Sequence, residues 1–287
     1  MHTQALTIAR EIGDRQGEAA SLGNLGYCHT NLGDYSRAID LHTQALTIAR
    51  EIGDRQLEGH EAENLGNCHY QLGDYPKAID LHTQALTLAR EIGNRYGEAA
   101  ALASLGQVWL ASGNERRAVT LLGQAVNVAD ITGDIESAVR ARSGLAWAHI
   151  QLGDPATALA ATAPGREIPY PTEEPNVRLL EGLALLELHR PGESVRAFDD
   201  TLRAVEALLA LAENNVAALQ ARTSALSGLA VATADPVRAD EAVQALTQLR
   251  TVTSAAGVVA ETRRLFSRIA LQDESGILAE LRTAQDL

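Results

Sequence analysis

The stretch HTQALTIAREIGDRQ at residues 2–16 recurs without a change at residues 42–56. Residues 82–93 repeat its first twelve positions with one substitution, leucine for isoleucine at Leu88. The chain is therefore built from a recurring unit, and equivalent positions stand at His2, His42 and His82. Because copies of one unit fold alike and bury their apolar faces against each other, this recurrence predicts a repeat protein.

A glycine stands every twenty residues in the first half of the chain, and an acidic residue or its amide follows each one. These glycines are Gly13, Gly33, Gly53, Gly73, Gly93, Gly113, Gly133 and Gly153. Glycine reaches the left-handed conformation that ends a helix, and Asp or Asn accepts the free N–H groups that begin the next helix. Each unit therefore contains two helices of about 27 Å, at a rise of ~1.5 Å per residue.

Both predicted helices of a unit carry an apolar stripe at spacings of three and four residues. In the first complete unit, residues 14–53, small residues at Gly26, Ala38 and Ala45 allow the two helix backbones to come close. Polar positions such as Arg50 and Glu51 also recur unchanged, although packing does not demand it. Recent duplication of the gene segment explains that identity most simply.

The pattern N-L-G-x-x-x-x-x-L-G-D-Y-x-x-A-I-x-x-H-x-Q-A-L resembles the tetratricopeptide repeat in its long, 40-residue form. It is similar to the repeats of Pins-type polarity adaptors and, more loosely, of kinesin light chains. The matching residues of the first complete unit are Leu25, Gly26, His29, Gly33, Tyr35, Ala38, His42 and Ala45, and the next unit matches at the equivalent positions from Leu65 to Ala85. The resemblance covers residues 1–163 and implies an all-α, right-handed superhelix (an α-solenoid), here with about six helix pairs.

We expect three segments along the chain. Residues 1–163 form the regular array, which starts in the middle of a repeat. Residues 164–176 contain four prolines, which are excluded from helix interiors, so a loop is expected there. Residues 177–287 hold weaker helical pairs, including helices at 215–234 and 236–255, and two last helices at 258–271 and 276–286 that close the stack.

The chain begins with what corresponds to the second helix of a pair. Its residues Ala5, Leu6 and Ile8 do not form the polar cap that is expected at the end of a solenoid. Two explanations remain open. Either the natural protein continues upstream, or this end of the chain meets another copy of itself.

Charge and composition exclude several classes of partner. The net charge of −13 argues against a nucleic-acid partner, which needs a basic surface. The sequence has no apolar run long enough to cross a bilayer and no charged-then-apolar leader, so we expect no membrane partner. Two cysteines are too few for a disulfide framework, and a cytoplasmic location is expected.

No catalytic motif is present. The chain lacks a phosphate-binding loop, a His-Glu-x-x-His pair and a Gly-x-Ser-x-Gly turn, so we expect neither an enzyme nor a bound cofactor. The recurring histidines follow the helix packing and are interpreted as core residues. The Cys28-His29 and Cys68-His69 pairs do not predict a metal site, because adjacent residues on a helix point about 100° apart and zinc needs four converging ligands.

In tetratricopeptide arrays, the first helix of each pair lines a concave groove that holds a partner. The resemblance implies that positions flanking the Leu-Gly pair point into it. Our candidate partner-binding residues are Asn24, Tyr27, His60, Glu63, Asn64, Asn67, Tyr70, Gln107, Arg140 and Trp147, with Ser104, Leu110 and Ile150 among their neighbours. Asn24, Asn64 and Asn67 match asparagines that bind an extended partner's backbone in Pins-type adaptors. The alternative is that these polar residues merely face water.

The sequence therefore predicts a scaffold that binds a peptide or protein. A second hypothesis adds that the chain is the C-terminal sensor or interaction arm of a larger bacterial signalling ATPase or regulator, which long arrays of this kind resemble. The main rival is self-association into a homodimer through the uncapped first helix.

Overall fold

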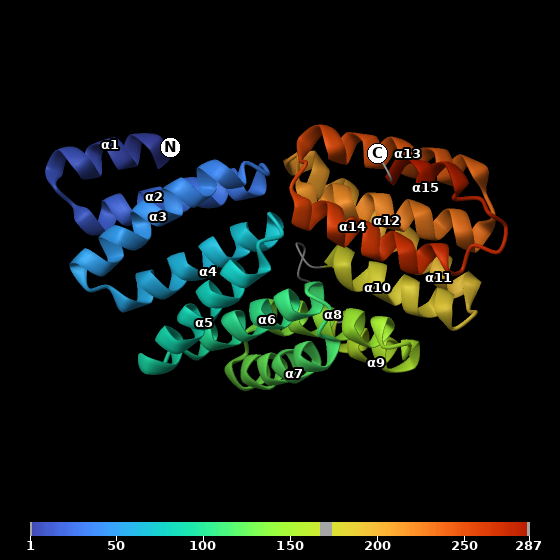
Figure 1. The fold of residues 1–287 in the computed structure, drawn as a ribbon, viewed down its shortest axis with the longest axis horizontal. Coiled ribbons are helices and arrows are strands. Elements are labelled where there is room, and N and C mark those ends of the chain that lie inside the picture. Colours follow the sequence, from blue (N-terminus) through green and yellow to red (C-terminus); the bar gives the residue numbers. More distant parts are fainter. Residues whose placement is uncertain (1, 167–173, 286–287) are drawn as a thin grey trace. The chain divides into compact units, whose positions relative to one another are not determined.

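The computed structural model describes residues 2–166 and 174–285, and these residues form fifteen helices and no strand (Figure 1). The helices separate into two compact units, residues 1–137 and 138–287, which are described in turn. The first unit holds α1 (His2–Ile12), α2 (Arg15–Asn31), α3 (Tyr35–Ile52), α4 (Arg55–Gln71), α5 (Tyr75–Glu91), α6 (Arg95–Ala111) and α7 (Glu115–Thr132). The all-α repeat architecture predicted from the sequence is confirmed.

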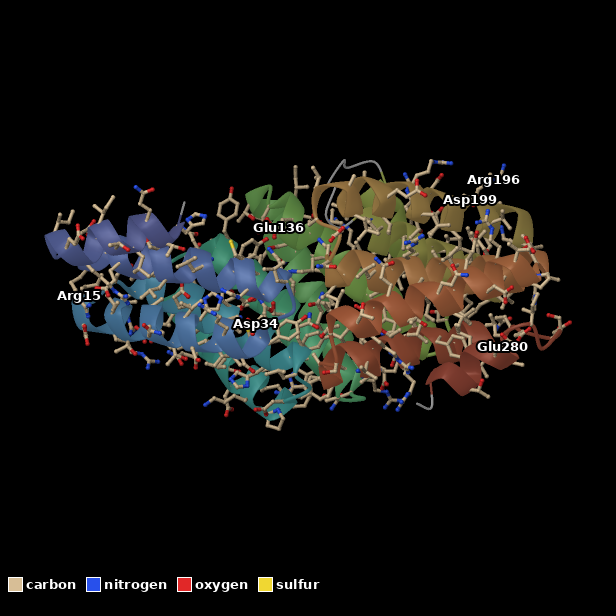
Figure 2. The ribbon with its side chains drawn as sticks, turned by 90° about the horizontal axis from the view of Figure 1, so that it is seen from above. Arg15, Asp34, Glu136, Arg196, Asp199 and Glu280 are labelled. Carbon is tan, nitrogen blue, oxygen red and sulfur yellow. The ribbon has the colours of Figure 1, made fainter. Side chains whose placement is uncertain are left out.

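The predicted helix boundaries of the first unit are also confirmed. All eight periodic glycines have a positive φ, between 70° and 81°. At the end of α3, Gly53 has φ 72° and its N–H donates to the carbonyl oxygens of Ala49 and Arg50. Asp54 then accepts from the N–H of Leu57 at 3.0 Å and caps α4. Figure 2 labels Arg15, at the start of α2, and Asp34, which caps α3.

We expect Gly53→Ala to lower the free energy of unfolding by roughly 1–2 kcal/mol, because an L residue is strained in the left-handed conformation. A methyl group at Gly53 would meet no atom within 4 Å, so the backbone angle is the sole cause. Gly123 provides the matched control, since it lies inside α7 and is also surrounded by open space. Gly123→Ala is expected to stabilise the protein by roughly 0.5–1 kcal/mol. Urea unfolding of both variants tests the opposite signs.

Paired helices of the first unit approach closely at the predicted glycines. α2 packs on α3, α4 on α5, and α6 on α7. A Cβ atom at Gly26 would lie 2.6 Å from Nε2 of His42, and one at Gly66 would lie 2.5 Å from Cε1 of His82. Both histidines are buried beneath these glycines. The small residue in each Leu-Gly pair therefore makes room for the histidine of the following helix.

Arginine and glutamate side chains form ion pairs at the corners between repeats. Glu58, at the start of α4, accepts from Arg50 of α3 at 3.0 Å and from Arg55 at 2.7 Å. Arg55 also donates to Glu91 of α5 at 2.6 Å. The same arrangement recurs one repeat earlier, around Glu18. Our interpretation that packing does not demand the repeated polar residues was therefore incomplete, because Arg50 and its counterparts join one unit to the next.

The second unit holds α8 (Ile135–Gln151), α9 (Pro155–Arg166), α10 (Glu174–Glu187), α11 (Pro191–Leu211), α12 (Val216–Thr233), α13 (Pro236–Val252), α14 (Ala256–Ala270) and α15 (Ala279–Gln285). The last four agree with the helices expected from the sequence to within a few residues at their ends. Two corners lack the periodic glycine. His189, with φ 55°, and Ala234, with φ 54°, take the left-handed conformation instead.

The expected loop at 164–176 is helical at both described ends. α9 continues through Pro164 to Arg166, and α10 begins at Glu174. The prediction was wrong for these flanks because a proline in the last turn removes one hydrogen bond of a helix that ends two residues later. The middle of the expected loop, residues 167–173, lies outside the described residues. Among the helices that are described, none combines the length and the apolar character needed to cross a bilayer.

Candidate functional site

The first helices of the repeats carry one recurring face that their partner helices leave uncovered. On α2 this face consists of Ala20, Asn24, Tyr27 and Asn31, all of which are exposed. On α4 it consists of His60, Asn64, Asn67 and Gln71, which are exposed or half-buried. Spacings of four, three and four residues place each set on one side of its helix. We call these eight residues the first-helix surface.

The two halves of the first-helix surface belong to neighbouring helices. Thr30 Oγ1 of α2 lies 3.4 Å from Sγ of Cys68 on α4. A Cβ at Gly23 of α2 would collide with Oε1 of Glu61 on α4. Because the helices contact each other at both points, the polar faces of α2 and α4 run side by side.

The equivalent face of α6, the first helix of the next repeat, is less exposed. Tyr27 on α2 is 59% exposed, whereas the α6 counterparts Ser104 and Gln107 are buried and half-buried respectively. Leu110 of α6 is buried as well. The expectation that Ser104 and Leu110 line a groove was therefore wrong. Their side chains pack inside the first unit because α6 is rich in alanine and leucine and is enclosed by α4, α5 and α7.

Two predicted site residues make contacts with other helices of the protein. Glu63 accepts from Ser104 Oγ at 2.5 Å and from His82 Nδ1 at 2.9 Å, and little of its side chain is exposed. Tyr70 stacks at a tilt against Tyr75, with 6.0 Å between the ring centroids. Their contacts join α4 to α5 and α6. A sequence pattern that places them on the outer face does not reveal partners from other repeats.

A buried histidine–glutamate hydrogen bond that the sequence did not predict lies directly beneath the first-helix surface. Nδ1 of His42 donates to Oε2 of Glu61 at 2.7 Å, and both side chains are 1% exposed. His60, on the surface above, lies 3.6 Å from the same carboxylate. One feature of the sequence could have indicated this contact: Glu61 occupies the repeat position of Ser21 and Ala101, where small, uncharged residues are otherwise found.

The electrostatics of this pair follow from burial and its two histidines. Burial acts to raise the pKa of Glu61, but the hydrogen bond from His42 and the nearby His60 outweigh it and hold the pKa below its ordinary value. The same interaction with Glu61 raises the pKa of His60 above its ordinary value, against a smaller effect of desolvation. His60 therefore presents a site of raised proton affinity on the first-helix surface.

The other recurring histidines have structural roles. Nδ1 of His29 lies 3.3 Å from Asp34, and Nδ1 of His69 lies 3.2 Å from Asp74, so each histidine contacts the acid that caps the next helix. The interpretation of the histidines as packing residues is confirmed for the buried His42 and for its counterpart His82. Within the described residues, no three His, Cys, Asp or Glu side chains gather closely enough to hold a metal ion.

Arg140 and Trp147, the remaining predicted site residues, lie on α8 in the second unit. They are seven positions apart, on one side of the helix, and both are half-buried. Ile150, expected beside them in a groove, is fully buried. That expectation was wrong because Ile150 packs into the apolar core that α8 shares with α9 and α10.

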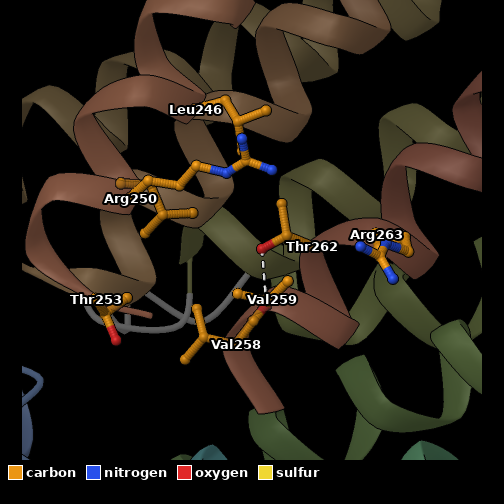
Figure 3. A pocket seen from close by; sticks show the side chains of 8 residues that line it. Leu246, Arg250, Thr253, Val258, Val259, Thr262 and Arg263 are labelled. Atoms are coloured by element: carbon orange, nitrogen blue, oxygen red, sulfur yellow. Dashed lines mark hydrogen bonds between the residues drawn. The ribbon is translucent and has the colours of Figure 1, made fainter. Parts of the chain in front are cut away.

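Described residues of the second unit line two hollows. One, between α13 and α14, has a volume of about 20 Å³, enough for roughly one water molecule, and its wall is mostly apolar (Figure 3). The other, of about 290 Å³, opens among α11, α12 and α13 and is lined by Arg222, Arg238, Glu206 and Glu241 together with glutamines and apolar residues.

Part of the chain matches a known repeat family, and solved structures share its fold. The family model described as tetratricopeptide repeat matches residues 1–51 and 60–131. No curated protein matched the sequence. Three solved structures share the fold at low sequence identity. Aspartyl phosphate phosphatase F from Bacillus subtilis has a TM-score of 0.69 at 12% identity, with 98% of this chain and 74% of that chain covered.

The other two structures contain a ligand. A Rap protein complexed with competence and sporulation factor has a TM-score of 0.61 at 15% identity, with 93% of this chain and 81% of that chain covered. The Rap conjugation gene regulator of plasmid pLS20, in complex with the Phr* peptide, has a TM-score of 0.60 at 11% identity. That match covers 94% of this chain and 76% of the regulator.

Proposed function

We propose that this chain, whose residues 1–51 and 60–131 match the tetratricopeptide repeat model, is a scaffold that binds a peptide or a protein segment on its first-helix surface. One observation carries the proposal. Asn24, Asn64 and Asn67 lie on adjacent helices of one continuous face, and their amides are exposed or half-buried. An amide both donates and accepts hydrogen bonds, which suits it to the N–H and C=O groups of an extended chain.

The surface offers an aromatic side chain as well as polar groups. Tyr27 is largely exposed between Asn24 and Asn31, and aromatic side chains commonly dominate binding energy at interfaces. His60 contributes a titratable group next to Asn64. Glu63 and Tyr70 make contacts within the protein, so we assign contact with the partner to Asn24, Tyr27, His60, Asn64 and Asn67. Gln107 extends the same face onto α6.

Relatives of the same fold support a peptide ligand. The Rap protein with competence and sporulation factor and the conjugation regulator with the Phr* peptide both carry a ligand on a helical array of this type. By analogy, the chain serves as the sensor arm of a cytoplasmic bacterial signalling ATPase or regulator. Binding would then shift an inhibited state toward an active one. Measuring effector activity with and without the ligand tests this role, and equal activities contradict it.

Self-association is the second candidate function. The observation that favours it is the exposed apolar side of α1, where Ile12 is 71% exposed. Two copies could cover this side by pairing about a two-fold axis. Light scattering over a range of concentrations decides the matter. A mass that stays at the monomer value of 30.5 kDa at the highest concentration excludes the homodimer.

The peptide-binding proposal predicts that the double variant Asn64→Ala, Asn67→Ala weakens partner binding by roughly tenfold or more, since each lost hydrogen bond contributes about 0.5–1.5 kcal/mol. The partner is first isolated on the immobilised chain, and its dissociation constant is then measured by calorimetry. Asn127→Ala is the matched control, because Asn127 is an exposed asparagine on the second-helix side, in α7. Equal affinity of the double variant and the control would contradict the assigned surface.

A further inference from the structure

An arginine in the larger hollow of the second unit lacks a carboxylate partner. Arg222 is the only charged residue of α12, and most of that helix is buried. Its side chain is half-buried, and its one hydrogen bond among the described residues is a long one, to Oε1 of Gln248 at 3.4 Å. A charge that is partly withdrawn from water costs free energy unless an opposite charge or good hydrogen bonds compensate it. Packing of the helices therefore does not account for this arginine.

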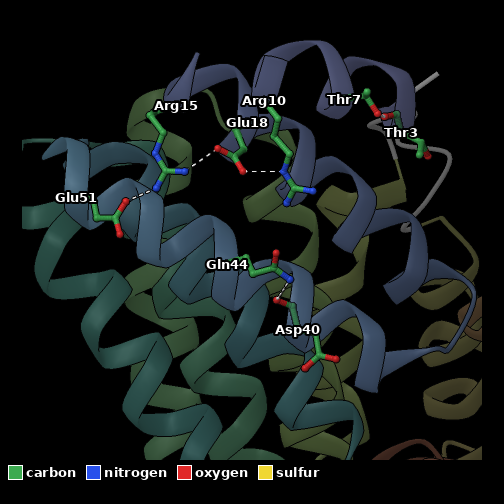
Figure 4. Close-up of polar contacts among 8 residues, drawn as sticks. All are labelled: Thr3, Thr7, Arg10, Arg15, Glu18, Asp40, Gln44 and Glu51. Atoms are coloured by element: carbon green, nitrogen blue, oxygen red, sulfur yellow. Dashed lines mark hydrogen bonds and ion pairs between the residues drawn. The ribbon is translucent and has the colours of Figure 1, made fainter. Parts of the chain in front are cut away.

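An arginine of the first unit shows the contrasting arrangement. Arg15 pairs with Glu18 at 2.6 Å and also with Glu51 (Figure 4). A carboxylate offers two oxygen atoms to a guanidinium, which presents five N–H donors in a rigid fork. Arg222 lines a hollow in which no carboxylate of the described residues pairs with that fork. It is therefore available to a carboxylate from outside the chain.

The same hollow also contains an unpaired negative charge. Glu206, on α11, is exposed and forms neither a hydrogen bond nor an ion pair among the described residues. The other two charged residues of the lining satisfy each other, since Arg238 donates to Glu241 at 2.8 Å. Glu206 and Arg222 line the hollow from adjacent helices but form no ion pair with each other. The hollow therefore offers one anion and one cation with open space beside both.

The rest of the wall suits an aliphatic group. Val205 of α11, Leu226 of α12 and Ala245 of α13 are buried and contribute apolar surface to the hollow. Its volume of about 290 Å³ lies at the lower end of the range for small-molecule sites, roughly 300–1,000 Å³. A ligand that fits this wall is therefore small, with one apolar part and two opposite charges.

We propose that this hollow binds a free α-amino acid with an aliphatic side chain. The α-carboxylate accepts two hydrogen bonds from the guanidinium of Arg222, whose fork matches the geometry of a carboxylate. The α-ammonium group donates to the carboxylate of Glu206. The aliphatic side chain covers the apolar wall and leaves water. The hollow shares no residue with the first-helix surface, so its test is independent of the proposed function.

Calorimetry on the full chain with free amino acids and their analogues tests the ligand class. We expect saturable binding of leucine. Leucinamide lacks the carboxylate and 4-methylpentanoate lacks the ammonium group, so each should bind roughly tenfold more weakly or worse, because each leaves one charge of the hollow unpaired. Absence of binding by alanine, valine and leucine at millimolar concentrations overturns the proposal. Binding of inorganic phosphate as tightly as leucine also overturns it, since the hollow would then be a general anion site.

Arg222→Gln should weaken leucine binding roughly tenfold or more, because it removes the charged hydrogen bonds to the carboxylate. Arg203→Gln is the matched control, since Arg203 is exposed on α11 outside the hollow, and it should leave the affinity unchanged. Without ligand, Arg222→Gln should keep or raise the melting temperature, because the charge that it removes has no carboxylate partner. A lowered melting temperature together with lost binding would mean that Arg222 supports the fold, and overturns the proposal.

Glu206→Gln tests the contact with the ammonium group. It should weaken leucine binding and reduce the preference for leucine over 4-methylpentanoate, because no negative charge then remains to favour the ammonium group. Glu213→Gln, at an exposed position just after α11, is the matched control and should change neither affinity. A ratio of the two affinities that stays the same in Glu206→Gln overturns the proposal, since the hollow would then not recognise both charges of the amino acid.

Discussion

Replacing Phe198 with alanine is expected to lower the free energy of unfolding of the second unit by about 3–5 kcal/mol, the usual cost of removing a buried phenylalanine ring. The side chain is fully buried on α11. A Cβ at Gly182 of α10 would lie 2.6 Å from its ring, and one at Gly228 of α12 would lie closer still. The ring therefore fills the space between two backbones that cannot close over the void without moving whole helices.

Urea unfolding followed by circular dichroism measures this loss, with Leu211→Ala as the control because Leu211 lies exposed at the end of the same helix. A second measurement tests the geometry itself. Gly228→Ala should destabilise the parent protein, since its methyl group meets the ring. In the Phe198→Ala background the same change should be tolerated or stabilising. Additive effects of the two substitutions would contradict the packing described for α11.

Glu61→Ala is expected to cost about 1–3 kcal/mol or more at neutral pH, because it leaves the buried Nδ1 of His42 without its hydrogen-bond partner. The substitution removes the acceptor of His42 Nδ1 beneath Gly26 and leaves a cavity between α2 and α4. Glu51→Ala, which removes an exposed carboxylate from an ion pair with Arg15, should change stability little because water screens that pair. An equal loss of unfolding free energy in Glu61→Ala and Glu51→Ala would contradict the argument that burial sets the size of the effect.

The stability that Glu61 provides should depend on pH with a defined sign. Its pKa is lowered in the folded protein, so its contribution is complete above the ordinary carboxylate value of about 4.3 and is lost as the pH falls through the lowered value. The pKa of His60 is raised, so its contribution is complete below about 6.5 and is lost as the pH rises through the raised value. The difference in free energy of unfolding between the parent and Glu61→Ala should therefore be largest between about pH 4.3 and pH 6.5 and smallest in strong acid.

Features of the fold that depend on neighbouring residues were predictable from the sequence. Gly53 and Asp54 mark a corner because their backbone and side-chain preferences act within one turn of chain. His189 and Ala234 perform the same role without the expected residue. Prolines still mark the start of the next helix at both corners, but the glycine is missing, and packing of the helices on either side overrides the local preference for glycine. For the same reason α9 continues through Pro164, where local preference indicated a loop.

The candidate site was less predictable because its contacts cross from one repeat to another. The repeat pattern placed Asn64 and Asn67 on an open face, and the structure agrees with that placement. It placed Glu63 there too, but Ser104 of the next repeat donates a hydrogen bond to it. Glu61 was missed altogether, since its partner His42 lies on the preceding helix pair. A pattern within one repeat carries no information about such partners.

The corners at Gly13 and Gly53 have the same sequence, so a whole repeat between them could be removed or added. The residues on either side of both corners are the same, REI before and GDRQ after, and the bracket of Arg10 and Arg15 around Glu18 matches that of Arg50 and Arg55 around Glu58. Excising residues 13–52 would join α1 directly to α4 through an interface that already exists between α3 and α4. Recombination within the gene would therefore shorten or lengthen the protein in steps of one helix pair, and the helices joined in each product would meet at an interface of the kind already present between α3 and α4.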